Sequence, residues 1–425
     1  MNIAELHQLF LLHPNVSTDT RKISKNDIFF ALKGDNFNGN EYALKAIEKG
    51  ASYVIIDEKE FAISERTILV ADVLTTLQKL ASFHRQYCDT KVISLTGSNG
   101  KTTTKELINA VLSKKYKTIA TKGNLNNHIG VPLSLLDISP CTEITIIEMG
   151  ANHQKEIAFL SSIAAPDYGY ITNFGKAHLE GFGGVEGVIK GKSELYDYLT
   201  ANGKAVFMNA DDPIQKEKLD HYVHKYGFST TDSKFYNITM TAADPFVEIT
   251  VEGTTIKTQL IGSYNFTNCC AAIIMGTYFN VPLAQIKKGL ENYLPDNNRS
   301  QVLEKNGFTV ILDAYNANPS SMTAALENFA NLKAKTKIVF LGDMFELGDT
   351  AHAEHQAIAE LTKQLGFENA YLIGENFFKV QSDYNKFKTY DEVADFLIAN
   401  SIQTGATLFI KGSRGMALER MLDSI

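Results

Sequence analysis

Short runs of hydrophobic residues recur along the chain, and most of them end in a glycine or a polar residue. Examples are residues 27–32, 91–96, 144–150, 168–175 and 205–211. Between them lie longer stretches whose hydrophobic residues recur every three or four positions, which is the spacing of an amphipathic helix. Strands that alternate with helices in this way predict parallel α/β sheets, whose ligands bind at the carboxyl ends of the strands.

The pattern divides the chain of 425 residues into three parts, and a chain of this length also favours several domains. We predict an α/β fold with domains at residues 1–87, 88–295 and 296–425. Hydrophobic and polar positions alternate over residues 234–262, which predicts antiparallel strands at the edge of a central parallel sheet. The third part again alternates strands with helices and predicts a Rossmann-like domain.

A glycine-rich loop follows the predicted strand at residues 91–96 and precedes a predicted helix. Gly100, Lys101 and Thr102 match the end of the phosphate-loop pattern G-x-x-x-x-G-K-[ST], but Gly97 lies two residues too close to them. In such a loop, backbone N–H groups and the start of the helix surround the phosphates. Lys101 would neutralise the β- and γ-phosphates, and Thr102 would bind Mg²⁺. We therefore predict a nucleotide-binding central domain.

Three further polar residues are candidates for chemistry. Glu148 ends a hydrophobic run, where its carboxylate can either help to hold Mg²⁺ or face water, and the nearby phosphate loop favours the metal. His178 lies in a glycine-rich segment, and Lys192 lies on a predicted helix. Taken alone, these two residues are more simply interpreted as a structural histidine and a solvated lysine.

Composition narrows the class of function. Hydrophobic residues make up 44% and charged residues 21%, as in ordinary soluble globular proteins. The formal net charge of −7 argues against a nucleic-acid partner, because no basic excess is available to neutralise phosphates. The four cysteines lack the spacing of a zinc site or a disulfide framework, and the N-terminus predicts a short amphipathic helix. We expect a cytoplasmic protein with small-molecule substrates and no membrane partner.

Several motifs occur in an order that resembles the Mur ligases, the ATP-dependent amide ligases of peptidoglycan synthesis. They are TGSNGKTTT from Thr96, EMG from Glu148, AHLEGFGG from Ala177 and KGKSELY from Lys190. The family's phosphate loop has the same shortened form, and the resemblance covers nearly the whole chain. Within the family, LDAYNANPSSM, LGDMFELG, TKGNLNNHIGVPLSLL and KGSRGMALER resemble the member that adds D-alanyl-D-alanine.

The resemblance implies a ligase that joins D-alanyl-D-alanine to UDP-N-acetylmuramoyl-tripeptide, the last cytoplasmic step of peptidoglycan precursor synthesis. ATP would phosphorylate the terminal carboxylate of the tripeptide, and the dipeptide amine would attack the resulting acyl phosphate. The three domains would bind UDP, the ATP phosphates, and the ATP ribose with the dipeptide, respectively. We expect a monomer. The third residue of the tripeptide stays open between L-lysine and meso-diaminopimelate.

For the catalytic centre the resemblance implies two Mg²⁺ ions. Thr102 and Glu148 would hold the first ion, and His178 would help to hold the second. Arg299 would cross from the third domain to the γ-phosphate, although its neighbours differ from the usual Gly-Arg-Leu.

A lysine that carries CO₂ as a carbamate would complete the second metal site. A carbamate has anionic oxygens that can bind Mg²⁺, whereas an ammonium group has none. Lys190 and Lys192 are the two candidates. We favour Lys192, because Glu194 follows it at the family's spacing.

The remaining contacts to ATP are also implied by the resemblance. Asn268 would face the adenine, and Asn265 is either a second adenine contact or a helix cap. Asp313 would bind the ribose hydroxyls. The loop residues assigned to the phosphates are Thr96, Gly97, Ser98, Asn99, Gly100, Lys101, Thr102 and Thr103.

The acceptor dipeptide is a small zwitterion, which needs groups that donate and accept hydrogen bonds. We assign it to Tyr315, Asn316 and Asn318, with Lys411 and Arg414 as further candidates for its carboxylate. The residues assigned to the UDP-linked substrate are Thr20, Arg21, Gly34, Asn38, Asn124, Asn126 and Asn127. Thr20 stands where the family commonly has the serine of an Asp-Ser-Arg triplet.

Two alternatives remain at this stage. One is a sister Mur ligase or a folylpolyglutamate-type ligase, which would share the central domain but add a different amine. The other is a nucleotide-binding NTPase that forms no bond and hydrolyses ATP without a peptide substrate.

Overall fold

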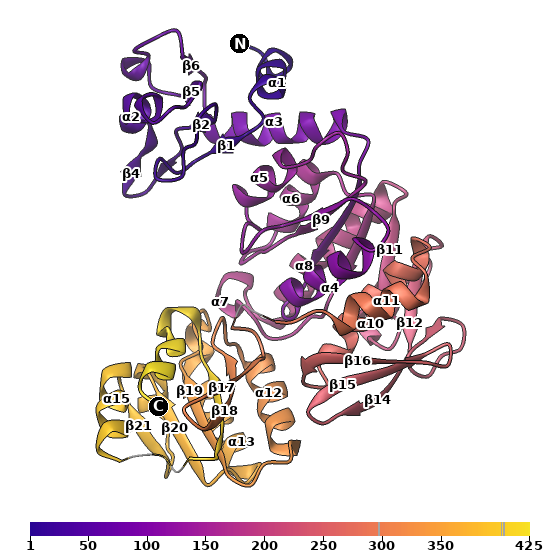
Figure 1. The fold of residues 1–425 in the computed structure, drawn as a ribbon, viewed down its shortest axis with the longest axis vertical. Coiled ribbons are helices and arrows are strands. Elements are labelled where there is room, and N and C mark those ends of the chain that lie inside the picture. Colours follow the sequence, from indigo (N-terminus) through magenta and orange to yellow (C-terminus); the bar gives the residue numbers. More distant parts are fainter. Residues whose placement is uncertain (296–297, 401, 403) are drawn as a thin grey trace.

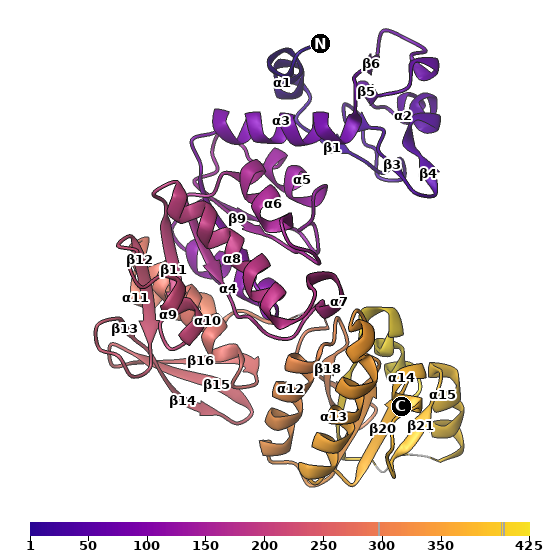
Figure 2. The same ribbon diagram turned by 180° about the vertical axis from the view of Figure 1, so that it is seen from behind.

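The computed structural model describes residues 1–295, 298–400, 402 and 404–425. Three bodies follow one another, with the N-terminal and C-terminal parts at opposite ends of the molecule (Figures 1 and 2). The predicted boundary at residue 88 lies just after helix α3 (Val73–Tyr87). The predicted boundary at residue 296 lies outside the described residues. The domain limits therefore stay predictions.

The N-terminal part is a small α/β unit. Its helices and strands are α1 (Ile3–Leu12), β1 (Val16–Ser17), β2 (Ile28–Phe30), β3 (Lys33–Gly34), β4 (Phe37–Asn38), α2 (Ala43–Glu48), β5 (Tyr53–Ile56), β6 (Thr67–Leu69) and α3. Strands β1, β2, β5 and β6 form one parallel sheet, and β3 pairs with β4. Helix α3 begins after Asp72, whose side chain accepts a hydrogen bond from the N–H of Thr75.

The central part contains a seven-stranded sheet whose described strand pairs are all parallel. Its elements are β7 (Lys91–Thr96), α4 (Lys101–Leu112), β8 (Thr118–Ala120), α5 (Gly130–Leu136), β9 (Ile144–Glu148), α6 (Glu156–Ala164), β10 (Tyr168–Ile171), α7 (Leu179–Phe182), α8 (Val185–Ala201), β11 (Ala205–Asn209), α9 (Pro213–Lys218), β12 (Lys225–Ser229) and β13 (Tyr236–Asn237). Strand β7 lies between β9 and β10. The phosphate loop therefore opens at the same sheet edge as Glu148, which is paired in register with Leu95.

The antiparallel strands predicted within residues 234–262 exist, but most of them do not extend the central sheet. Only β13 joins it, and β13 pairs in parallel with β12. The next elements, β14 (Thr239–Ala243), β15 (Phe246–Val251) and β16 (Thr254–Ile261), form a separate antiparallel sheet. The reason is packing: alternate residues of β15 and β16 are buried together with residues of helix α10 (Asn265–Tyr278) and helix α11 (Leu283–Glu291).

The C-terminal part has the predicted alternation of strands and helices. Its elements are β17 (Gln301–Lys305), β18 (Phe308–Asp313), α12 (Pro319–Asn331), β19 (Lys337–Gly342), α13 (Ala351–Gln364), β20 (Asn369–Ile373), α14 (Glu375–Phe378), β21 (Asn385–Phe387), α15 (Tyr390–Ala399) and β22 (Thr407–Lys411). The strand order is β17-β18-β22-β19-β20-β21, with β17 antiparallel to β18 and the other pairs parallel. The carboxyl ends of β18 and β22 therefore lie next to each other.

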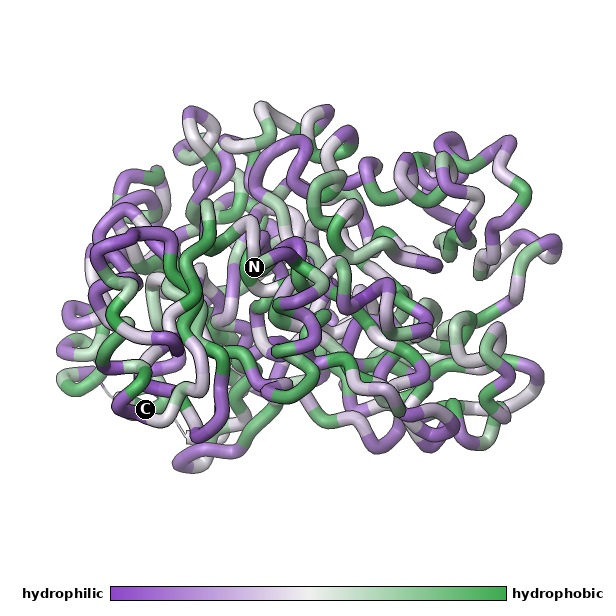
Figure 3. Tube along the Cα trace, turned by 90° about the horizontal axis from the view of Figure 1, so that it is seen from above, coloured by the Kyte–Doolittle hydropathy of each residue, from purple (hydrophilic) through white to green (hydrophobic). Residues whose placement is uncertain are grey.

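The described helices include none that is long and apolar enough to cross a membrane. Along the chain trace, hydrophobic and hydrophilic residues succeed one another in short runs (Figure 3).

A buried pair of histidines joins the N-terminal helices to the central part. Nε2 of His7 on α1 lies 3.0 Å from Nδ1 of His84 on α3, and Nε2 of His84 lies 2.8 Å from the backbone oxygen of Ile138. The carbonyl can only accept, so His84 carries a hydrogen on Nε2, and when His84 is neutral, His7 donates to its Nδ1 lone pair. The Nδ1 atom of His7 is buried without a partner among the described residues. With both rings neutral, each buried ring N–H has an acceptor.

We expect the free energy of unfolding to fall as the pH drops below 6.5. Burial lowers the pKa of His7 and His84 from the ordinary 6.5, and for His7 the charge of His84 adds to the effect. Below 6.5 the unfolded chain therefore takes up protons that the native state excludes, which costs up to about 1.4 kcal/mol per pH unit for each proton. Urea unfolding between pH 7.5 and 5 checks this. His7→Gln should flatten the dependence, whereas His221→Gln, at a side chain 98% exposed, should leave it unchanged.

Candidate active site

A cavity of about 1140 Å³ lies where the central and C-terminal parts meet. Its wall is formed by the carboxyl ends of β7, β9, β10, β18 and β22 and by the start of α10. The predicted site residues that line it are Ser98, Asn99, Gly100, Lys101, Thr102, Thr103, Asn126, Asn127, Glu148, His178, Asn265, Asn268, Arg299, Asp313, Tyr315, Asn316, Asn318 and Lys411. The structure thus brings together residues that lie far apart in the sequence.

The shortened phosphate loop has a left-handed backbone at both glycines, with φ of 141° at Gly97 and 79° at Gly100. A side chain at Gly97 would also collide with its surroundings, because a Cβ atom there would lie 2.0 Å from Oγ1 of Thr172. Asn173, two residues after the end of β10, accepts a hydrogen bond from the N–H of Asn99 and donates one to its carbonyl. The loop is therefore held from the neighbouring strand without the two residues that longer phosphate loops contain.

Lys101 points back over the loop that carries it. Its Nζ donates to the backbone oxygens of Gly97 (2.7 Å) and Ser98 (3.2 Å). Burial, opposed by the charge of Glu148 and assisted by that of Arg299, lowers the pKa of Lys101 to about 8. Two cationic side chains in one partly buried site favour an anionic ligand, which would raise the pKa of the lysine again.

Glu148 and Thr102 are the candidate protein ligands for a magnesium ion. Glu148 is 2% exposed, and its Oε1 accepts a hydrogen bond from Asn126, whereas its buried Oε2 has no partner within the described residues. An unpartnered buried carboxylate oxygen is costly unless a cation or a donor meets it. The hydroxyl of Thr102 lines the same cavity. No three His, Cys, Asp or Glu side chains in the described part of the chain could hold a metal by themselves. An ion here would therefore also need water or phosphate oxygens.

Lys192 is fully buried, whereas Lys190 is exposed. Nζ of Lys192 donates to the backbone oxygen of Ala151 (3.0 Å) and lies 4.8 Å from the ring centre of Phe182. Burial, followed by the charge of Lys101, lowers the pKa of Lys192 well below its ordinary value. The neutral amine is the form that can react with CO₂. Lys192 itself lies just behind the cavity wall, to which Ala151 belongs.

His178 lies directly before α7 and lines the cavity. Its Nδ1 forms a hydrogen bond with the carboxylate of Glu346, which belongs to the C-terminal part. In both views α7 lies beside the C-terminal part (Figures 1 and 2). The hydrogen bond to His178 lowers the pKa of Glu346.

The two asparagines assigned to adenine lie in the first turn of α10. Asn268 accepts a hydrogen bond from the hydroxyl of Thr104 (2.9 Å) and donates one to Asn265 (2.8 Å). Asn265 donates to the backbone oxygen of Ile261 (2.7 Å) and is not the residue that precedes the helix, since that residue is Tyr264. The alternative interpretation of Asn265 as a helix cap is therefore wrong. Both side chains remain candidates for the adenine contact.

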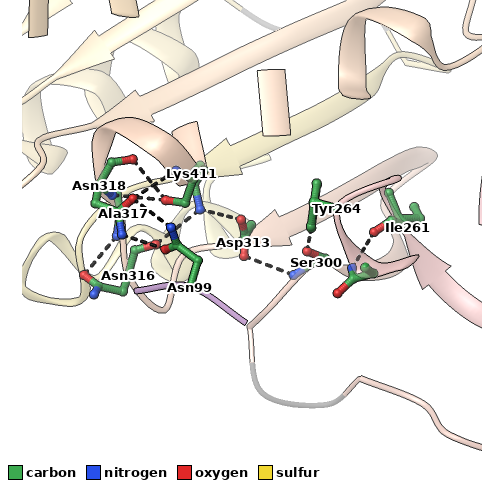
Figure 4. A network of polar contacts seen from close by, with 11 residues as sticks. Asn99, Ile261, Tyr264, Ser300, Asp313, Asn316, Ala317, Asn318 and Lys411 are labelled. Atoms are coloured by element: carbon green, nitrogen blue, oxygen red, sulfur yellow. Dashed lines mark hydrogen bonds and ion pairs between the residues drawn. The ribbon is translucent and has the colours of Figure 1, made fainter. Parts of the chain in front are cut away.

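Arg299 and Asp313 bring the C-terminal part to the ATP site. The guanidinium of Arg299 lies 3.7 Å above the ring centre of Tyr315, and its Nε is buried without a partner in the part of the chain that the structure describes. Asp313 accepts hydrogen bonds from the N–H of Ser300 (3.1 Å) and from Nζ of Lys411 (2.5 Å) (Figure 4). Lys411 therefore neutralises Asp313 in this structure, and its assignment to the dipeptide carboxylate stays a prediction.

The segment assigned to the dipeptide lies against the phosphate loop. Asn318 precedes α12, caps it by accepting from the N–H of Ser321, and donates to Oδ1 of Asn99 (2.7 Å) (Figure 4). Asn99 returns a longer bond of 3.4 Å. The hydroxyl of Tyr315 accepts from Arg414 (3.1 Å).

The residues assigned to the UDP-linked substrate are divided between two regions. Asn126 and Asn127 line the interdomain cavity, and Oδ1 of Asn127 also accepts a hydrogen bond from the N–H of Gly130, the first residue of α5. Arg21 is 87% exposed and forms a bidentate pair with Asp19 on the N-terminal part. The predicted site residues that lie outside the cavity wall are Thr20, Arg21, Gly34, Asn38, Thr96, Gly97, Asn124, Lys192 and Arg414.

Sequence reasoning missed several residues of the site. The sequence could have indicated Asn173, since it lies just after a hydrophobic run, much as Glu148 lies at the end of one. Ser300, Tyr264 and Glu346 had none, because their partners lie far away in the chain: Tyr264 pairs with Ser300 (2.7 Å), and Glu346 pairs with His178.

Comparison with known proteins identifies the family of this chain. The Mur ligase middle-domain model matches residues 95–276, and the glutamate ligase domain model of the same family matches residues 298–414. A third model, described as the catalytic domain of the family, matches residues 14–85. The UDP-N-acetylmuramoyl-tripeptide–D-alanyl-D-alanine ligase of Bacillus subtilis (strain 168) is 33% identical over 100% of this chain and 97% of the relative. The chain belongs to the Mur ligase family.

Solved structures place this Mur ligase among proteins with the same overall fold. Crystal structure I of MurF from Acinetobacter baumannii is 29% identical, has a TM-score of 0.85, and is matched over 96% of this chain and 92% of that chain. The MurF ligase of Thermotoga maritima in complex with ADP is 26% identical, with a TM-score of 0.84 and coverage of 97% of both chains. The predicted α/β fold with three parts is therefore confirmed.

Proposed function

We propose that this Mur ligase uses ATP to join D-alanyl-D-alanine to UDP-N-acetylmuramoyl-tripeptide in peptidoglycan precursor synthesis, the reaction named for its relatives. The observation that carries the proposal is the contact between Asn99 in the phosphate loop and Asn318 in the segment 313–318. It brings the predicted nucleotide and acceptor sites into one cavity, as a ligase requires.

The γ-phosphoryl group of ATP would pass to the terminal carboxylate of the tripeptide, with release of ADP. The dipeptide amine would then form the new C–N bond as the C–O bond to phosphate breaks and the amine loses a proton. Phosphoryl transfer needs alignment and neutralised charge more than a protein nucleophile. Lys101 and Arg299, which both line the cavity, would supply that charge, and Asp313 would orient the ribose.

We propose that the enzyme uses two Mg²⁺ ions. Thr102 and the unpartnered oxygen of Glu148 would hold one, and His178 with a carbamate on Lys192 would hold the other. The carbamate forms when the neutral amine adds to CO₂ and releases a proton. Bound Mg²⁺ would neutralise the charge of the transferred group. The fully buried, weakly basic Lys192 supports its choice over exposed Lys190.

We expect ADP release to require both UDP-N-acetylmuramoyl-tripeptide and D-alanyl-D-alanine. A coupled ADP assay should show rates at least about tenfold lower with L-lysine, diaminopimelate or L-glutamate, because a site built for one amine leaves polar groups unpaired with another. Mass spectrometry of the product with each tripeptide would identify the third residue. Equal ATP hydrolysis with and without the tripeptide would contradict a ligase and favour the simple NTPase.

The cellular setting is part of the proposal. The substrates are small nucleotide-linked and amino-acid molecules, which supports a cytoplasmic enzyme. We also propose that the chain acts as a monomer with domain limits at 87/88 and 295/296. Both the phosphate loop and the residues that face it come from one chain, so the cavity needs no second copy to be complete.

A further inference from the structure

Glu346 contacts a proposed metal ligand, although the mechanism above gives it no role. It lies in the C-terminal part between β19 and α13, and its carboxylate is hydrogen-bonded to Nδ1 of His178 in the central part. Within the described residues the imidazole makes no other hydrogen bond. His178 lines the cavity, whereas Glu346 lies outside the described wall. The carboxylate therefore occupies Nδ1, and Nε2 is the ring nitrogen left for a metal ion.

This hydrogen bond selects one form of the imidazole. An ionised carboxylate can only accept, so Nδ1 of His178 carries the hydrogen and Nε2 of the neutral ring carries the lone pair. Histidines that bind metals usually donate their other ring N–H to a carboxylate or a carbonyl in this way, which fixes the ring and makes it a better ligand.

The backbone around Glu346 is shaped to make the contact. Glu346 has a φ of 61°, in the left-handed region that residues with a side chain rarely adopt. Its carbonyl accepts a hydrogen bond from the N–H of Glu180 in α7 (3.3 Å). Gly348 lies so close to α7 that a Cβ atom there would come within 3.2 Å of Cγ of Glu180. The strained residue is thus supported by the helix that follows His178.

We propose that Glu346 is a positioning residue that fixes His178 with Nε2 available to the second Mg²⁺ ion. The carboxylate comes from the C-terminal part and the imidazole from the central part. The metal site is therefore complete only when the C-terminal part is docked against α7. This inference rests on the proposed function, because it takes His178 as a metal ligand.

Manganese binding tests the proposal without measuring turnover. The full-length protein is labelled with ¹⁵N-histidine and loaded with Mn²⁺, β,γ-methylene-ATP and UDP-N-acetylmuramoyl-tripeptide. Pulsed electron paramagnetic resonance then detects a histidine nitrogen bound to Mn²⁺, and titration gives the affinity for each ion. We expect Glu346→Ala to weaken the second ion about 10- to 100-fold and to diminish the nitrogen coupling, with the first ion unchanged. Glu346→Asp should fall in between.

Glu354→Gln is the matched control. It removes the ion pair between Glu354 and Lys176 (2.7 Å), which joins the same two parts of the molecule without touching His178. It should leave the nitrogen coupling unchanged. Equal losses in Glu346→Ala and Glu354→Gln would mean that docking alone matters, and would overturn the positioning role.

His178→Ala separates this inference from the proposed function. If the nitrogen coupling survives in His178→Ala, the assignment of His178 as a ligand fails. If it disappears there but stays intact in Glu346→Ala, only the role of Glu346 fails. Thermal unfolding of each variant shows that it is folded under the conditions of the titration.

Discussion

Replacing Lys192 with alanine is expected to lower kcat about 100-fold or more, and short carboxylic acids should restore part of the activity. The reason is charge: without a carbamate the second Mg²⁺ loses an anionic ligand, and a metal ion at the transferred group contributes several kcal/mol to the transition state. Added acetate or formate can occupy the space of the side chain and supply a carboxylate. The measurement is ADP release with both peptide substrates, with and without the added acid.

Lys190→Ala is the matched control for this prediction. Lys190 lies two residues away on the same helix but is exposed, so its loss should leave kcat within about twofold of the wild type, as expected for an exposed substitution that disturbs no buried contact. Lys192→Met fills most of the same volume and separates the loss of the amine from a packing defect. Wild-type activity should also fall in buffer freed of CO₂. Full activity in Lys192→Ala, or an equal loss in Lys190→Ala, would remove the carbamate from the mechanism.

The parts of the site that follow a strand could be predicted from the sequence. The phosphate loop and Glu148 each come directly after a hydrophobic run, and parallel strands place such residues at one edge of a sheet. Local pattern is sufficient there, because the register of β7 with β9 follows from burying both runs. Asp313 and Lys411 end the neighbouring strands β18 and β22 in the structure, which brings them into contact.

Contacts between distant parts of the chain could not be predicted in this way. Asn99 and Asn318 are 219 positions apart, and each was assigned only to its own ligand. The pairing of His178 with Glu346 depends on how the C-terminal part docks, which no local spacing encodes. The separate sheet of β14, β15 and β16 shows the same limit. Alternation predicts that one face of a strand is buried, but it does not say whether another sheet or helix α10 covers that face.

Arg299→Ala is expected to lower kcat about 1,000-fold, with a much smaller effect on the affinity for ATP. An arginine placed on the γ-phosphate acts mainly on the charge that develops during transfer, and its loss in comparable enzymes costs about 10³- to 10⁵-fold. In this structure the guanidinium lies on the ring of Tyr315, and its positive charge helps to lower the pKa of Lys101. Steady-state ADP release and equilibrium binding of β,γ-methylene-ATP separate the two effects.

Arg299→Lys tells whether geometry matters as well as charge. Lysine keeps the positive charge but loses the planar group that stacks on Tyr315 and presents several donors, so we expect it to recover only a minor part of the lost rate. Arg420→Ala is the matched control, because Arg420 stacks on Tyr390 (4.1 Å) in the same part of the molecule but does not line the cavity. It should leave kcat unchanged. If Arg299→Ala kept a kcat near that of Arg420→Ala, the positive charge that stabilises the γ-phosphate during transfer would have to come from another residue.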